Sequence, residues 1–87
     1  MKKLVSVTEV EDEGFESLMG SRITLFCMNY IYTGTLIGVN KTCVLLDDPA
    51  IVYETGEFTS KEWRNAQTLP NQWYVQISAV ESFGILK

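Results

Sequence analysis

The sequence predicts a small, mostly β domain in which a short N-terminal α-helix precedes five strongly bent antiparallel strands that form a small barrel. Three observations lead to this prediction. The chain has 87 residues, which is the length of one domain. Its composition, with 46% hydrophobic and 21% charged residues, is typical of a folded chain and not of a disordered one. From residue 22 onward, runs of β-branched and aromatic residues alternate with turn residues, as they do in strands.

The N-terminal helix is expected within residues 9–21. Phe15, Leu18 and Met19 follow the i, i+3, i+4 spacing of one helical face. Acidic residues precede or open this stretch, where the positive end of the helix dipole stabilises them. Gly20 suits the C-terminal end of such a helix, so the pattern predicts a short helix that stops before the first strand.

The expected strands are apolar runs bounded by turn residues, at residues 23–28, 31–39, 43–48, 73–77 and 80–86. The first run is apolar at both alternating sets of positions, which predicts a strand that is covered on both faces. Gly34 and Gly38, inside the second run, mark positions at which a strand of a small barrel bends sharply. Pro49 either ends the third strand or forms a bulge before Ala50.

A long connection at about residues 54–72 separates the third and fourth strands. Phe58, Trp63 and Leu69 are expected to hold this connection against the domain. Long connections between strands usually project from the scaffold and carry function. Because Trp and Arg are common in binding hot spots, Trp63 and Arg64 are predicted to contact a partner. The alternative is a loop that a single aromatic residue anchors.

The net charge of −4 is distributed unevenly along the chain. Residues 1–16 carry two basic and five acidic side chains, a balance of −3. The other 71 residues carry five basic and six acidic side chains, a balance of −1. A nucleic-acid-binding protein normally has a basic stripe, and this sequence has none.

Residue types that support catalysis are scarce. The chain has no His, and its two cysteines, Cys27 and Cys43, form no metal-binding CxxC spacing. Asp47 and Asp48 are expected at an exposed strand end, with a cation-binding pair as the alternative. Because no nucleophile and base or metal-ligand cluster can be assembled, the sequence predicts a protein that is not an enzyme, with no cofactor and no metal.

Targeting segments are not expected in this chain. The N-terminal Met-Lys-Lys is followed by a short apolar run and then by acidic residues, unlike a signal peptide. No apolar stretch approaches the roughly 18 residues that a membrane-spanning helix needs. A cytoplasmic location is therefore expected, with no membrane contact and with both cysteines as free thiols.

Two stretches resemble proteins of the Sm-like family (LSm and Hfq type). Residues 15–25 resemble the helix, glycine and first strand of that family. Residues 31–48 resemble its first conserved motif, with a bending glycine, a hydrophobic-Gly-hydrophobic-Asn turn and an apolar strand that ends in acid. The turn length is closer to the bacterial RNA chaperone Hfq than to eukaryotic Sm proteins. The match covers roughly residues 14–53 and, more weakly, residues 73–86.

This resemblance implies a single Sm-like domain over residues 1–87, with an SH3-like barrel. It also implies a homo-oligomeric ring, which closes at about five to seven subunits in that family. Another SH3-like or OB-like barrel is the alternative fold. Apolar edge strands invite a neighbouring copy to pair with them. The residues predicted at that interface are Trp73, Val75, Ile77, Phe83 and Ile85.

The resemblance also indicates where RNA would bind. Sm-like proteins hold a base with the turn between strands two and three and the turn between strands four and five. At the matching positions this chain has Asn40, Lys41 and Thr42 in the first turn and Ser78 in the second. Asn40 alone resembles its counterpart, and no aromatic residue occupies the stacking position of the turn. Lys41 could contact a phosphate and Asn40 a base edge, while the alternative is that Asn40 only stabilises the turn.

The sequence is compatible with two functions. The first is a non-enzymatic Sm-like ring that binds single-stranded RNA, or an RNA chaperone. The second is a structural ring or protein-interaction adaptor that has lost RNA binding, which the acidic N-terminal region and the missing base-reading residues favour. The exposed aromatic candidates fit either function, since they could stack on bases or pack between subunits; they are Tyr30, Tyr32, Trp73 and Tyr74.

Overall fold

The computed structural model describes residues 14–87, which form an antiparallel and mostly β fold. Six strands are present: β1 (Arg22–Cys27), β2 (Ile31–Val39), β3 (Cys43–Glu54), β4 (Asn65–Thr68), β5 (Trp73–Gln76) and β6 (Val80–Gly84). Two short 3-10 helices accompany them, η1 (Gly14–Leu18) before β1 and η2 (Ile77–Ala79) between β5 and β6. The predicted mostly β, antiparallel character is therefore confirmed.

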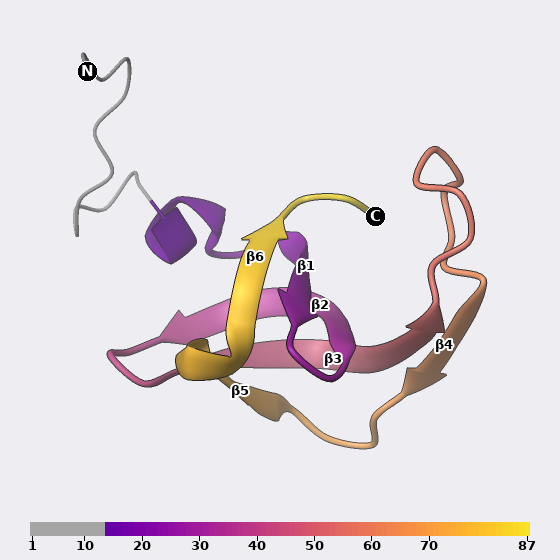
Figure 1. The fold of residues 1–87 in the computed structure, drawn as a ribbon. Coiled ribbons are helices and arrows are strands. Elements are labelled where there is room, and N and C mark those ends of the chain that lie inside the picture. Colours follow the sequence, from indigo (N-terminus) through magenta and orange to yellow (C-terminus); the bar gives the residue numbers. More distant parts are fainter. Residues whose placement is uncertain (1–13) are drawn as a thin grey trace, which may run out of the picture.

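All six strands belong to one sheet with the order β4-β3-β2-β1-β6, and β5 also pairs with β3. The long strand β3 serves two partners, because its first part pairs with β5 and its last part with β4. Figure 1 shows β1 and β6 on one side of the curved β2–β3 pair and β5 and β4 on the other. Within residues 14–87, no pairing joins β5 to β6. The sheet curls without closing, so the prediction of a five-stranded barrel is wrong in two respects, its closure and its strand count.

The sixth strand lies in the segment that the sequence predicts as a long connection. Residues 65–68 form β4, which pairs with Ala50–Glu54 of β3. All four side chains of β4 are exposed, so this strand has none of the apolar alternation that identifies a strand in a sequence. The connection that remains between β3 and β4 covers residues 55–64.

The predicted N-terminal α-helix is wrong for the residues that the structure describes, because only a 3-10 helix of five residues is present there. Gly14 and Gly20 both have positive φ angles, 61° and 86°, and they bound a segment too short to propagate an α-helix. Phe15 nevertheless packs as an anchor and stacks on Phe83, with ring centroids 3.8 Å apart. Leu18 packs against the core. Residues 9–13 of the expected helix lie outside the described part of the chain.

The core lies inside the curl of the sheet. Its buried side chains come from four strands and are Ile23, Leu25, Leu36, Val44, Leu46 and Val75. The opposite face of the sheet is also covered at its centre, where Thr24, Thr33 and Ala50 are buried. The predicted strand with two covered faces is therefore confirmed for β1, whose residues 23–25 are all buried.

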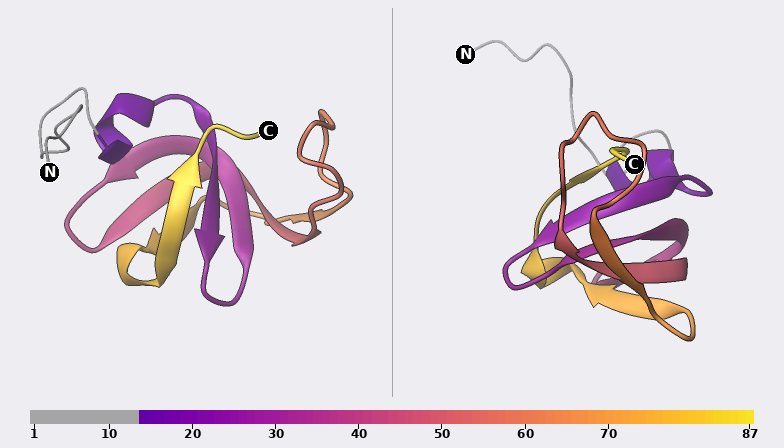
Figure 2. Two further views of the ribbon diagram at one scale, coloured as in Figure 1. Left: turned by 45° about the horizontal axis from the view of Figure 1, so that its top comes forward. Right: turned by 90° about the vertical axis from the view of Figure 1, so that its right-hand side faces the viewer.

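The connection between β3 and β4 helps to cover that second face. Phe58 of this connection meets Phe26 of β1 in an edge-to-face arrangement, with ring centroids 6.3 Å apart. Figure 2 shows the connection and the C-terminal segment rising on the same side of the sheet. The prediction that Phe58 holds the connection against the domain is confirmed by this contact.

The sharp bends in β2 and β3 occur at Gly34 and Pro49. The register skips from Thr33↔Ala50 to Thr35↔Asp47, so two residues of β3 bulge opposite Gly34. A Cβ on Gly34 would lie 3.1 Å from the carbonyl oxygen of Asp47 and 3.3 Å from the Cα of Pro49. Glycine is thus required for this close approach, and Pro49 forms a bulge without ending β3.

Candidate nucleic-acid interface

The turn between β2 and β3 is organised by the side chain of Asn40. Its Oδ1 atom accepts hydrogen bonds from the backbone N–H groups of Thr42 (2.8 Å) and Cys43 (2.9 Å), and from the Thr42 hydroxyl (3.2 Å). Among residues 14–87, positive φ angles occur only at glycines and at Asp48, so Asn40 is not needed for a left-handed conformation. Its role in the turn is that of a hydrogen-bond acceptor. The Asn40 side-chain NH₂ group remains as a donor that the turn bonds do not use.

The short helix η2 lies beside this turn. The backbone N–H of Ile77 donates to the carbonyl oxygen of Thr42 over 2.9 Å. The pairing of β3 with β5 places Cys43 opposite Gln76, directly before η2. Residues about 35 positions apart in the chain are therefore held together by the sheet register.

The turn and η2 form the walls of an open surface depression of about 650 Å³. It is lined by Lys41, Thr42, Cys43, Tyr74, Gln76, Ile77 and Ser78. Among the lining residues that the structure describes, Lys41 is the one with a charged side chain, and the others contribute hydroxyl and amide groups. This combination suits a phosphate and the polar edges of a nucleotide.

A smaller depression of about 140 Å³ adjoins the first. Its lining is mostly apolar and consists of Gly38, Val39, Asn40, Cys43, Leu45 and Tyr74. Cys43 and Tyr74 line both depressions. Of the four RNA-contact residues that the sequence predicts, Lys41, Thr42 and Ser78 therefore share the larger depression, and Asn40 lines its neighbour.

Tyr74 and Gln76 line the larger depression, together with Cys43 and Ile77, without having been predicted there. The sequence predicts Tyr74 only as a residue that stacks on bases or packs between subunits, with no place at this turn. Tyr74 pairs with Leu45 of β3, and its side chain is 65% exposed. Because successive strand residues point to opposite faces, Tyr74 and Gln76 face away from the core into which Val75 points. This alternation is present in the sequence and could have indicated that both residues share an outer face. Their contact with the β2–β3 turn depends on the register of β5.

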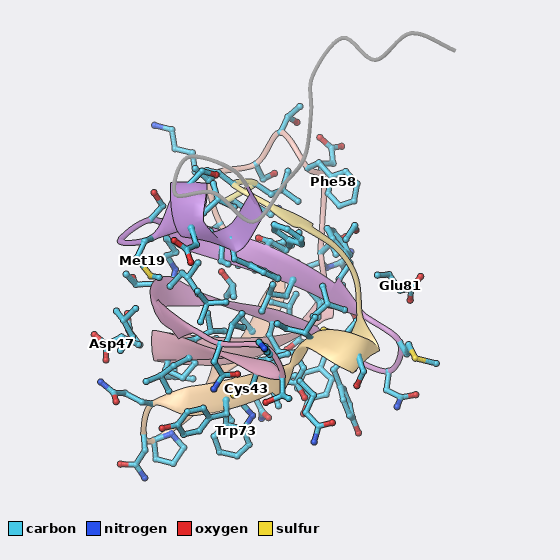
Figure 3. The ribbon with its side chains drawn as sticks, turned by 90° about the vertical axis from the view of Figure 1, so that its left-hand side faces the viewer. Met19, Cys43, Asp47, Phe58, Trp73 and Glu81 are labelled. Carbon is cyan, nitrogen blue, oxygen red and sulfur yellow. The ribbon has the colours of Figure 1, made fainter. Side chains whose placement is uncertain are left out.

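Trp63 and Arg64 lie far from these depressions. The depressions adjoin the beginning of β3, whereas the connection that holds Trp63 and Arg64 follows its end. Figure 3 likewise shows Phe58 of this connection and Trp73 of β5 at opposite ends of the molecule. Trp63 is half-buried beneath Lys87, while the Arg64 side chain is 73% exposed and its Nε lies 3.1 Å from Glu54 Oε2.

The five predicted interface residues differ in exposure. Val75 is 4% exposed and belongs to the core of its own chain, and Ile77 packs partly against the same core. Trp73 and Phe83 are each 39% exposed, and Ile85 is 66% exposed. The side chains of these last three residues are accessible to a neighbouring copy, whereas that of Val75 is not.

Two titratable groups outside the depressions have shifted pKa values. Burial raises the pKa of the Cys27 thiol above its ordinary value of 9.0, and the negative charge of Glu81 raises it further. Burial also raises the pKa of Tyr32 above 10.0, with smaller contributions from Cys27, Tyr30 and Tyr53. Both shifts favour the neutral, protonated form in the folded protein.

Within residues 14–87, no group of three or more His, Cys, Asp or Glu side chains could hold a metal ion. The described part of the chain contains no helix with the length and apolar character needed to cross a membrane. No protein-family model and no curated protein matches this chain.

Proposed function

We propose that this chain is a non-enzymatic Sm-like ring protein that binds single-stranded RNA. The observation that carries the proposal is the depression between the β2–β3 turn and η2, which joins Lys41 and Thr42 to Ser78. These two segments are the ones that the resemblance to Sm-like proteins associates with RNA. The Lys41 ammonium neutralises a phosphate, and the neighbouring hydroxyl and amide groups contact ribose or base edges.

The course of the sheet supports an Sm-like arrangement. Strands β2 and β3 bend at Gly34, and the last two strands are joined by a single turn of 3-10 helix. Strands β5 and β6 each have one pairing partner in the described chain, so each leaves an edge for another strand. Pairing of these edges between identical copies closes the curl from one subunit to the next and forms a ring.

Binding of RNA is tested by fluorescence anisotropy with labelled U-rich and A-rich oligonucleotides at low and physiological salt. Lys41→Ala is expected to weaken binding and to reduce its salt dependence, because phosphate contacts release counterions. Lys61→Ala is the matched control, since it removes the same charge from an exposed site in the distant connection. Equal losses in both variants would mean that only the total charge matters, and no binding to either oligonucleotide at low salt would refute the proposal.

The ring is tested by light scattering on the purified chain at micromolar concentration. The expected mass is that of about five to seven subunits, and a monomer would refute the ring. Ile85→Asp is expected to shift the protein to smaller species, because this exposed side chain follows the free edge strand β6. Ser60→Asp, which adds the same charge to the exposed connection, should leave the mass unchanged.

The second candidate function is a ring or adaptor that binds proteins and not RNA. Its supporting observation is the exposed surface of the connection between β3 and β4, where Phe58 is 57% exposed and the Arg64 side chain 73% exposed. Aromatic and Arg side chains contribute strongly to protein interfaces. An intact ring that binds neither oligonucleotide at low salt would favour this function over the first.

A further inference from the structure

We propose that Tyr74 is the stacking platform of this site and that each subunit holds two successive unpaired nucleotides, one in each of the adjoining depressions. The proposal rests on the RNA-binding function above and specifies the ligand of that site. The sequence has no aromatic residue in the β2–β3 turn, and the fold brings one there from β5. Tyr74 lines both depressions and leaves 65% of its surface exposed.

The register of three strands determines where Tyr74 lies. Leu45 of β3 is paired with Tyr74 on one side and with Gly38 of β2 on the other. Directly paired residues face the same side of a sheet, so the Tyr74 side chain and the bare backbone of Gly38 belong to one outer face. The Tyr74 ring on this face is accessible to a base because 65% of its surface is exposed.

Packing within the protein does not require glycine at position 38. A Cβ on Gly38 would lie 3.5 Å from the Cβ of Leu45, which is an ordinary contact distance, and its φ is not in the left-handed region. By contrast, a Cβ on Gly34 would lie 3.0 Å from the Cβ of Leu46. The absence of a side chain at Gly38 instead leaves the space of the smaller depression open.

The two depressions differ in chemistry. The larger one contains the Lys41 ammonium with the hydroxyls of Thr42 and Ser78, and it suits a nucleotide held through its phosphate and ribose. The smaller one is lined mainly by apolar groups, and the Asn40 side chain stands at its wall. Because the turn already uses the Asn40 oxygen, the NH₂ group remains to donate to an acceptor on a base edge.

Stacking of a base on an aromatic side chain contributes substantially to the binding of single-stranded nucleic acid. Tyr74→Ala is therefore expected to weaken oligonucleotide binding roughly tenfold, while the slope of affinity against salt stays the same. Tyr74→Phe keeps the ring and should bind within about twofold of the unsubstituted protein. Gly38→Ala should fold normally and weaken binding by filling the smaller depression.

These variants distinguish failure of the platform from failure of the RNA-binding function. If the protein binds RNA through Lys41 but Tyr74→Ala binds equally well, the platform is wrong and the proposed function stands. If the unsubstituted protein binds no oligonucleotide, both the proposed function and the Tyr74 platform are refuted. A change in the light-scattering mass of Tyr74→Ala would show that Tyr74 packs between subunits and would overturn the platform.

The two cysteines provide an independent footprint of the bound RNA. Cys43 lines both depressions, whereas Cys27 lies at the end of β1 and lines neither. Saturating U-rich oligonucleotide is expected to slow alkylation of Cys43 by iodoacetamide at least threefold and to leave Cys27 unchanged. An abasic oligonucleotide keeps the phosphates and lacks the bases, so it should protect Cys43 much less. Equal protection by both oligonucleotides, or no protection of Cys43, would overturn the proposal.

Discussion

The ammonium of Lys87 lies 4.6 Å from the centre of the Trp63 ring. The same group donates hydrogen bonds of 2.8 Å to the carbonyl oxygens of Thr55 and Glu57. One side chain of the C-terminal segment thus joins both ends of the connection between β3 and β4. Trp63 thus holds the connection against the C-terminal segment, and Arg64 beside it remains exposed.

Lys87→Met is expected to lower the free energy of unfolding by about 1–2 kcal/mol, because it removes a cation–π contact and two hydrogen bonds from a charged donor. Methionine keeps most of the side-chain volume, so the loss of stability is due to removal of the charged ammonium group. Urea unfolding measures the change. Lys61→Met, in the exposed part of the same connection, is the control and should change stability by less than about 0.5 kcal/mol. Equal values for the two variants would contradict a bonding role for Lys87.

Gly34→Ala is expected to destabilise the fold by about 1–3 kcal/mol, because its methyl group would press on the β3 backbone at the bulge. The backbone atoms of Asp47 and Pro49 cannot move aside as a flexible side chain can. Gly84→Ala is the matched control, since a Cβ there meets no atom within 4 Å. Thermal unfolding of both variants tests the prediction, which fails if Gly34→Ala unfolds at the same temperature as the control.

Asn40→Ala is expected to cost about 1 kcal/mol of stability, because four hydrogen bonds in an exposed turn lose their acceptor, one of them the weak bond from the Cys43 thiol. Asn40→Asp retains an acceptor oxygen and should stay within about 0.5 kcal/mol of the unsubstituted protein. The aspartate also removes the NH₂ donor, so RNA affinity should fall in a variant whose stability is unchanged. If Asn40→Asp is fully stable and binds RNA normally, then Asn40 stabilises the turn and does not contact RNA.

Stability is expected to fall at alkaline pH because of Cys27 and Tyr32. In each case the folded protein binds the proton more tightly than the unfolded chain, so the stabilisation is complete below the ordinary pKa values of 9.0 and 10.0. It is lost as the pH rises through the higher pKa values of the folded state. Urea midpoints measured from pH 8 upward should therefore decrease, and the decrease should be smaller in Cys27→Ala and Tyr32→Phe. If the urea midpoint of the Cys27→Ala, Tyr32→Phe double variant falls with pH as steeply as that of the unsubstituted protein, these two groups do not cause the loss of stability.

The features that the sequence by itself determined are those that depend on neighbours close in the chain. Apolar runs bounded by turn residues identified five strands, and Gly34 and Pro49 marked a bulge between β2 and β3. Asn40 marked a tight turn because its side-chain oxygen reaches N–H groups only two and three residues away. The sequence also pointed to Lys41 and Thr42 as turn residues without showing what lies opposite them.

The features that only the tertiary structure decided depend on strand register and on what covers each face. A helical spacing around Phe15 became a 3-10 turn, because glycines bound the segment and packing on Phe83 holds it. The polar strand β4 forms because β3 offers it a pairing edge, and its own side chains carry no signal. Val75 entered the core and Tyr74 the outer face because β5 pairs with β3 in one register, and a shift by one residue would exchange the two. That register brings together residues about 30 positions apart, so local sequence patterns cannot reveal it.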